Sequence, residues 1–147
     1  MAALERSALQ LGLTISTFDV RSADDFGSAF TDMRRSRMEA VLVVAASLFY
    51  SNARRIADLA LQAHLPSCHA FREAVLAGGL VSLGPDVVEI ARQVAGYIDK
   101  IMHGAKPADL PVQEPDRFDI ALNLKTAAAL GLTIPSILLA TANDVIE

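Results

Sequence analysis

Apolar residues recur at helical spacing in several stretches, and the clearest of these lies near the middle of the chain. Between Val87 and Met102 they follow a period of about 3.6 residues, which predicts an amphipathic helix. Asp86 occupies the N-cap position and Glu89 follows three residues later, a spacing that resembles a capping box. Gly104 comes just after the last turn, where glycine can adopt the left-handed conformation. The pattern therefore predicts a helix capped at both ends.

Short apolar runs alternate with the helical stretches. The longest, Ala40 to Ala46, is apolar at every position, which is typical of a strand buried on both faces of a parallel sheet. Such alternation predicts an α/β fold with a mainly parallel sheet and helices on both faces. The predicted strands are 13–20, 41–46, 66–70, 80–83 and 118–122, and we expect the first four to run parallel. The remaining predicted helices are 2–11, one capped by Ser22, one capped by Ser51, a short one that ends at Gly78 and Gly79, 126–130 and 135–142.

The composition changes after Gly104. Residues 105–115 carry three prolines and no periodicity, which favours an extended linker. We therefore expect an α/β lobe at 1–104, a linker at 105–117, and a strand with C-terminal helices at 118–147. One feature is irregular, because the predicted alternation opens with a helix that no strand precedes.

Charge and composition exclude several classes of function. The net charge is −4, so nothing in the overall charge favours binding to nucleic acid or to an anionic membrane. The single cysteine, Cys68, excludes an internal disulfide. No N-terminal signal peptide is visible, and no apolar run is long enough to span a membrane. If this were the whole product, we would expect it to be cytoplasmic.

No residue pattern indicates catalysis or a cofactor. The imidazoles His64, His69 and His103 lack the spacing of metal ligands, so no metal is expected. There is no G-x-S-x-G elbow, dinucleotide fingerprint or phosphate loop. An enzyme on a flavodoxin-like scaffold would need a catalytic constellation that the sequence does not contain. We therefore expect a protein that is not an enzyme and binds no cofactor.

The predicted fold still indicates where a ligand would bind. In open parallel sheets, ligands bind outside the carboxyl ends of the strands. Phe49, Phe71 and Arg72 follow such ends and are available to stack on or pair with a small organic molecule, although both phenylalanines are also suited to the core. The predicted ligand contacts are Ser47, Ala70, Phe71, Arg72 and Leu83.

Three segments resemble a known family. They are FREAVLAGGLVSLGPD, YIDKIMHGAKPADLPVQEP and NLKTAAALGLTIP, and they resemble the C-terminal half of ABC-transporter substrate-binding proteins. The similar subgroup is the one whose members bind aromatic or other amino acids. The likeness runs in order from about Leu4 to Glu147.

The resemblance implies a fold and a function. Members of this family are similar to type I periplasmic binding proteins, which have two Rossmann-like lobes joined by crossing strands and trap a solute between them. They are periplasmic or lipid-anchored outside the cytoplasm, and they deliver the solute to an ABC permease. The implied function is therefore that of the C-terminal solute-binding lobe of an importer, with a small, amino-acid-like organic solute.

The chain departs from the family pattern at positions that matter for binding. A full member is about twice as long, and the resemblance implies that an N-terminal lobe and the first strand of the C-terminal lobe are absent here. Members that bind amino acids carry an Asp near the end of the strand that precedes Ser47, where this chain has Ala46. They also favour Tyr at the position of Leu83. Both changes remove polar groups that would face an amino acid.

A second function remains open beside solute binding. The chain would then be a truncated, unexported α/β remnant that acts only as a dimerisation module or has no function. The resemblance places the absent strand inside the sheet, where its loss would leave two open edges. We therefore expect a homodimer that buries well over about 1,000 Å² through the tail or the sheet edge. The alternative is a monomer in which the tail strand at 118–122 folds back into the gap.

Overall fold

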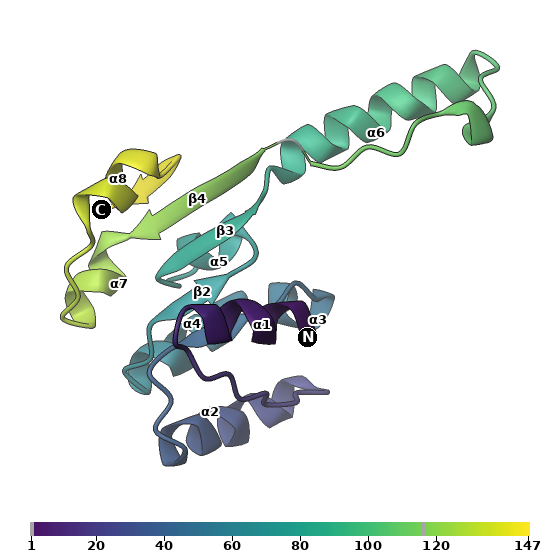
Figure 1. The fold of residues 1–147 in the computed structure, drawn as a ribbon. Helices are drawn as coiled ribbons and strands as arrows, with labels where there is room; N and C mark the ends of the chain where they lie inside the picture. Colours follow the sequence, from purple (N-terminus) through teal and green to yellow (C-terminus); the bar gives the residue numbers. More distant parts are fainter. Residues whose placement is uncertain (1, 116) are drawn as a thin grey trace.

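The structure is a computed structural model that describes residues 2–115 and 117–147. The side chains are described from Leu4 onwards. A five-stranded sheet in the order β1-β2-β3-β4-β5 forms its centre (Figure 1). Strands β1 to β3 are mutually parallel, β4 is antiparallel to β3, and β5 is parallel to β4. The strands are β1 (Val41–Val43), β2 (Ser67–His69), β3 (Val81–Pro85), β4 (Phe118–Asn123) and β5 (Asp144–Ile146).

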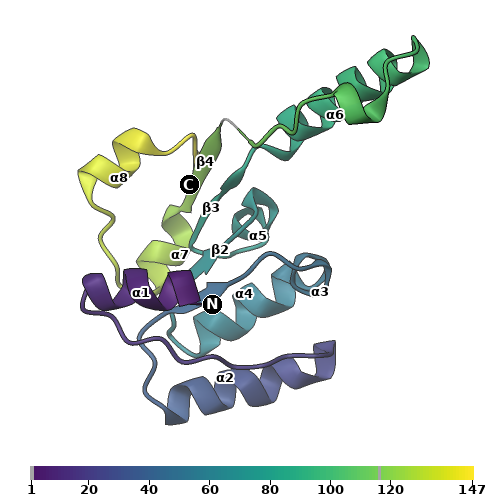
Figure 2. The same cartoon turned by 45° about the vertical axis from the view of Figure 1, so that its right-hand side comes forward.

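Helices lie on both sides of the β1 end of this sheet. Helices α2 and α4 pack on each other and on one face, whereas α1 lies on the other side (Figures 1 and 2). Short 3₁₀ turns, η1 (Ala23–Asp25) and η2 (Pro107–Asp109), precede α2 and follow α6. The helices are α1 (Ala2–Gln10), α2 (Phe26–Arg35), α3 (Ser47–Ser51), α4 (Ala53–Gln62), α5 (Arg72–Leu76), α6 (Val87–Met102), α7 (Leu124–Ala129) and α8 (Ser136–Thr141).

The main core lies between α2, α4 and β1. Phe26 and Phe30 of α2 and Ile56 of α4 are buried there, and Val41 and Val43 of β1 pack against them. These residues recur at helical spacing on α2 and α4 and at alternate positions on β1, as one buried face of each element requires. The apolar periodicity of the sequence therefore decides which side of each element enters this core.

The predicted α/β class with a mainly parallel sheet is confirmed, but one strand prediction is wrong. Residues 13–20 form no strand among the described residues and run as an extended segment beside β1. Their composition favours a strand, yet a strand needs a partner with which to share backbone hydrogen bonds, and none is paired with them. The three other strands, predicted at 41–46, 66–70 and 80–83, are found and run parallel as expected.

The tail joins the sheet at its far side. Strand β4 pairs with β3 over five residue pairs, from Val81 opposite Leu122 to Pro85 opposite Phe118. The alternative prediction, that the tail strand at 118–122 folds back into the gap left by the absent strand, is therefore wrong. The tail strand instead extends the sheet beyond β3. Asn123 secures the junction to α7, since its side chain donates to Val75 O and accepts from Thr126 N.

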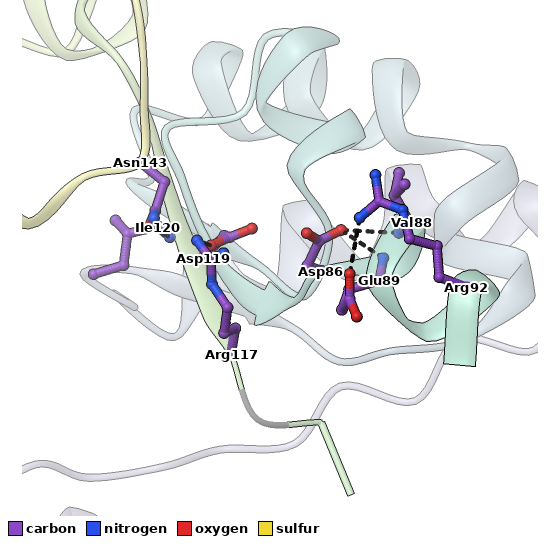
Figure 3. A network of polar contacts seen from close by, with 8 residues as sticks. All are labelled: Asp86, Val88, Glu89, Arg92, Arg117, Asp119, Ile120 and Asn143. Atoms are coloured by element: carbon purple, nitrogen blue, oxygen red, sulfur yellow. Dashed lines mark hydrogen bonds and ion pairs between the residues drawn. The ribbon is translucent and has the colours of Figure 1, made fainter. Parts of the chain in front are cut away.

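Helix α6 leaves the packed part of the molecule and projects outward as an arm (Figures 1 and 2). Its N-cap is the predicted Asp86, whose Oδ1 accepts hydrogen bonds from Val88 N at 2.9 Å and Glu89 N at 3.1 Å (Figure 3). None of the residues of α6 is buried. The helix is far too exposed to be a core element, and no helix among the described residues is long and apolar enough to cross a membrane.

Candidate ligand-binding site

The carboxyl ends of β1 and β2 open onto a cavity of about 380 Å³. The residues after β1 turn directly into α3, because the backbone of Ala46 is extended and its carbonyl accepts from Tyr50 N. Phe71 plays the same part after β2, as the extended residue before α5. The lining consists of Ala45, Ala46, Ser47, Tyr50, Ser51, Phe71 and Val87.

Two aromatic rings form one wall of this cavity. Tyr50 and Phe71 meet edge to face, with ring centroids 5.5 Å apart and an interplanar angle of 90°. This arrangement places the positive edge of one ring against the negative face of the other and holds both rings in position. The side chain of Tyr50 is half exposed, so its ring remains available to a ligand.

The predicted contact residues are only partly brought together. Ser47 and Phe71 line the same cavity, and Ala70 lines a far smaller cavity that also touches Tyr50 and Phe71. Arg72 forms an ion pair with Asp144 of β5 and is not among the lining residues. Leu83 is 55% exposed on β3 opposite Ile120, and it too is outside the lining.

Phe49, the other aromatic residue that the sequence offered as a ligand contact, lies outside this cavity. Phe49 packs against the main core, and its ring centroid lies 6.1 Å from that of Phe26. Phe49 and Tyr50 are adjacent on α3 and therefore point in different directions, one towards the core and one towards the cavity. Of the two readings that the sequence left open for Phe49, packing in the core is the one observed.

The sheet is tightly packed at β2 and β3, close in sequence to the lining residue Phe71. His69 is buried, its Nε2 lies 3.0 Å from Ser67 Oγ, and burial lowers its pKa to about 4. A Cβ added at Gly84 would lie 1.8 Å from the carbonyl oxygen of Ala70, so the close approach of β3 to the backbone after β2 requires glycine at this position. The imidazole of His69 is therefore neutral at pH 7, and glycine at position 84 lets β3 approach the backbone of Ala70.

Sequence reasoning missed Tyr50 and Val87 as lining residues. Tyr50 lies three residues after Ser47 on α3, so one helical turn brings both side chains to the same side. That spacing was a usable signal once α3 was expected to begin at Ser47. Val87 is the first residue of α6, and no pattern in the sequence shows the direction in which α6 leaves β3.

The cavity offers hydroxyl groups and apolar surface. Ser47, Ser51 and Tyr50 supply hydroxyls, and no acidic side chain is among the residues that line it. The described part of the chain also contains no group of three or more His, Cys, Asp or Glu side chains able to hold a metal ion. The cavity therefore presents neutral hydroxyl groups beside apolar and aromatic surface.

A mainly parallel sheet with an aromatic-walled cavity at its carboxyl edge defines an α/β ligand-binding lobe. The family model described as ABC transporter substrate binding protein matches residues 1–146, so the chain belongs to that family. None of the curated proteins compared with the chain matches it.

Solved structures show the same architecture. A conserved domain protein from Vibrio cholerae O1 biovar eltor is 28% identical with a TM-score of 0.90, over 98% of this chain and 48% of its own. The ABC domain in complex with L-Trp from Streptococcus pneumonia is 30% identical with a TM-score of 0.89, over 99% of this chain and 50% of its own.

A more distant structure supports the fold alone. The ligand-free, open structure of a substrate-binding protein with adhesive properties from Clostridium difficile is 21% identical with a TM-score of 0.69, and the match covers 99% of this chain and 48% of that one. The chain therefore spans about half the length of the solved structures that it matches.

Proposed function

We propose that this chain is a solute-binding lobe of an ABC importer, and that its solute binds in the cavity at the carboxyl ends of β1 and β2. The observation that carries the proposal is the aromatic wall, in which Tyr50 and Phe71 are held edge to face beside Ser47. A cavity of about 380 Å³ falls within the usual range of roughly 300–1,000 Å³ for small-molecule sites. The role is binding and delivery, without catalysis.

The solute is a compact organic molecule with an aromatic or otherwise apolar body. The lining supports this class because rings and alanine side chains dominate it. The L-Trp complex of the Streptococcus pneumonia domain supports an amino-acid-like solute. The absence of an acidic lining residue, however, leaves an ammonium group without an anionic partner in this lobe. An aromatic acid without an amino group therefore fits the lining at least as well as an amino acid does.

The other predicted contacts remain part of the proposal. Ala70 lines a small cavity together with Phe71, and Leu83 offers exposed apolar surface on β3. Arg72 is available to an anionic group of the solute when it is released from Asp144. The partner is the permease of an ABC importer, and the place of action is outside the cytoplasm.

The experiment is a binding titration of the chain with two probes, L-Trp and 3-indolepropionate. Changes in the NMR chemical shifts of the chain report binding and its location. We expect 3-indolepropionate to bind at least as tightly as L-Trp. Phe71→Ala should weaken binding by roughly 1–3 kcal/mol because it removes a desolvated aromatic anchor. The matched control is Phe118→Ala, which removes an exposed ring outside the cavity and should leave affinity unchanged.

Three results would overturn this assignment. Equal affinity of the wild type and the Phe71→Ala variant would exclude the aromatic wall as the binding surface. A clear preference for L-Trp over its desamino analogue would require an anionic group that this cavity does not contain. Chemical-shift changes confined to residues outside the cavity would show that the probes bind at another site.

A further inference from the structure

Helix α5 begins at the aromatic wall of the ligand cavity. Phe71, the extended residue directly before α5, carries one of the two rings of that wall, and its carbonyl accepts a hydrogen bond from Ala74 N. The helix packs on β3 and β4. With five residues it cannot hold itself in place, because isolated helices shorter than about 12–15 residues are marginal in water. The position of Phe71 therefore depends on the contacts that hold α5.

Polar contacts join the two ends of α5 to the tail, residues 117–147. At the first residue of the helix, Nε and Nη2 of Arg72 contact Oδ2 of Asp144 on β5. Just past the end of the helix, Gly78 O accepts a hydrogen bond from Oγ1 of Thr126 on α7 at 2.9 Å. The two contacts join positions that are 72 and 48 residues apart in the chain. A shift or tilt of α5 on the sheet would break at least one of them.

The tail is itself held in register, so it can serve as the support for α5. Asn143, directly before β5, donates from its backbone N to Ile120 O at 2.8 Å and accepts from Ile120 N through its side-chain oxygen at 2.9 Å. This pair of hydrogen bonds fixes β5 against β4 and thereby fixes the place of Asp144. Asn123 of β4 adds a contact in the middle of α5, where its Nδ2 donates to Val75 O at 3.1 Å.

These tail residues can act on the ligand cavity only through α5. Neither Asp144 nor Thr126 is among the residues that line the cavity. The rings of Tyr50 and Phe71 meet at an interplanar angle of 90°, with centroids 5.5 Å apart. Because an edge-to-face contact depends on the relative position of both rings, a displacement of α5 would separate Phe71 from Tyr50 and open the wall.

We propose that Asp144 and Thr126 are positioning residues of the ligand site, which hold Phe71 against Tyr50 through the two ends of α5. The inference rests on the proposed function, because it takes the cavity beside these two rings as the binding site. The tail is thereby part of the solute-binding machinery although it lines none of the cavity. The coupling is reciprocal: an attached tail favours the solute, and a bound solute favours the attached tail.

The test removes both contacts from the full chain with little change in side-chain volume. The test variant combines Asp144→Asn with Thr126→Val. The matched control combines Asp58→Asn with Thr31→Val. It likewise removes a carboxylate paired with an arginine and a hydroxyl that donates to a glycine carbonyl, but it does so on α4 and α2.

Two quantities are measured under conditions in which circular dichroism shows every variant to be folded. The first is the nuclear Overhauser contact between the rings of Tyr50 and Phe71 in the chain without solute. The second is the affinity for indole, a neutral ring that needs no ionic partner. We expect the test variant to lose most of the ring contact and to bind indole about tenfold more weakly, since it lacks two polar contacts. The control should stay within about twofold of the wild type.

A charge exchange separates positioning from a general loss of stability. Asp144→Arg alone places two cations together and should weaken the ring contact and the affinity for indole. Adding Arg72→Asp restores an ion pair of reversed sense and should recover both quantities.

Three results would overturn the inference. An unchanged ring contact in the test variant would show that the tail does not position Phe71. Unchanged affinity for indole in a variant that has lost the ring contact would show that the positioning has no effect on binding. Equal losses in the test variant and the control would assign them to general destabilisation. Because the ring contact is measured without solute, it decides the inference even if indole does not bind the wild type, a result that would count against the proposed function alone.

Discussion

Helices α4 and α6 are both amphipathic, yet only one has a partner for its apolar face. Ile56, Ala57 and Ala60 of α4 are at most 2% exposed, whereas Val94 and Ile98 of α6 are 50% and 57% exposed. The two sequences show the same kind of periodicity and both form helices. The difference teaches that periodicity predicts a helix and the face that it can bury, while the covering surface depends on elements far away in the chain.

The exposed stripe of α6 is part of a larger excess of surface. A compact monomer of 15.7 kDa would expose about 7,300 Å². This chain exposes 10011 Å². The excess of about 2,700 Å² is larger than a standard protein–protein interface, which buries roughly 1,600 Å² in total. The arm formed by α6 contributes to this excess, because none of its residues is buried, whereas the residues of the α2–α4 core are buried.

The largest expected difference between the two helices comes from matched truncations. Ile56→Ala should lower the free energy of unfolding by about 2–5 kcal/mol, because it leaves a cavity in the main core. Ile98→Ala removes the same atoms from an exposed stripe and should change it by no more than about 0.5 kcal/mol. Urea unfolding followed by circular dichroism measures both values. A loss of more than about 1 kcal/mol in Ile98→Ala would show that the stripe is covered in solution, and its dependence on protein concentration would identify self-association.

Acid should destabilise the packed half of the molecule before the arm. Burial holds the pKa of His69 at about 4, below its unfolded value of 6.5, so the folded protein keeps this imidazole neutral. Above pH 6.5 the buried neutral imidazole does not lower the free energy of unfolding. As the pH falls from 6.5 towards 4, only the unfolded state gains the proton, so the free energy of unfolding falls by roughly 3 kcal/mol in all. Unfolding free energies measured across this range should fall more steeply for the wild type than for His69→Gln. Parallel curves would mean that the imidazole is protonated without opening the core.

How far the sequence predicts this fold depends on whether local patterns have local partners. A strand within 41–46, which covers Val41–Val43, is found, and so are the helix after Asp86 and the left-handed Gly104 with φ of 97°, because caps and apolar runs act over a few residues. The strand at 13–20 fails because strand formation needs a neighbour. Strand β5 was missed because its three residues are too few to show alternation.

The candidate site follows the same rule. Ser47 and Phe71 were expected from the topology of parallel sheets, and both line the cavity. Arg72 was expected at the same edge, but its side chain turns to Asp144, a residue 72 positions away that no local pattern connects with it. Tyr50 and Val87 depend on the exact start of α3 and on the path of α6. Sequence reasoning therefore predicts at which edge of the sheet the candidate cavity lies, while long-range contacts decide which side chains line it.

The smallest effect is expected at the start of the arm, where it sharpens the comparison between the helices. Asp86→Ala removes the oxygen that accepts from Val88 N and Glu89 N, and a lost N-cap costs about 0.5–2 kcal/mol of helix stability. Because α6 has no buried residue, this loss should fray the arm without changing the urea midpoint of the core. Hydrogen exchange of the α6 amides should therefore accelerate, and Asp86→Ser, which keeps an oxygen at the cap, should restore most of the protection. A shift of the whole unfolding transition in Asp86→Ala would show instead that α6 and the core unfold as one cooperative unit.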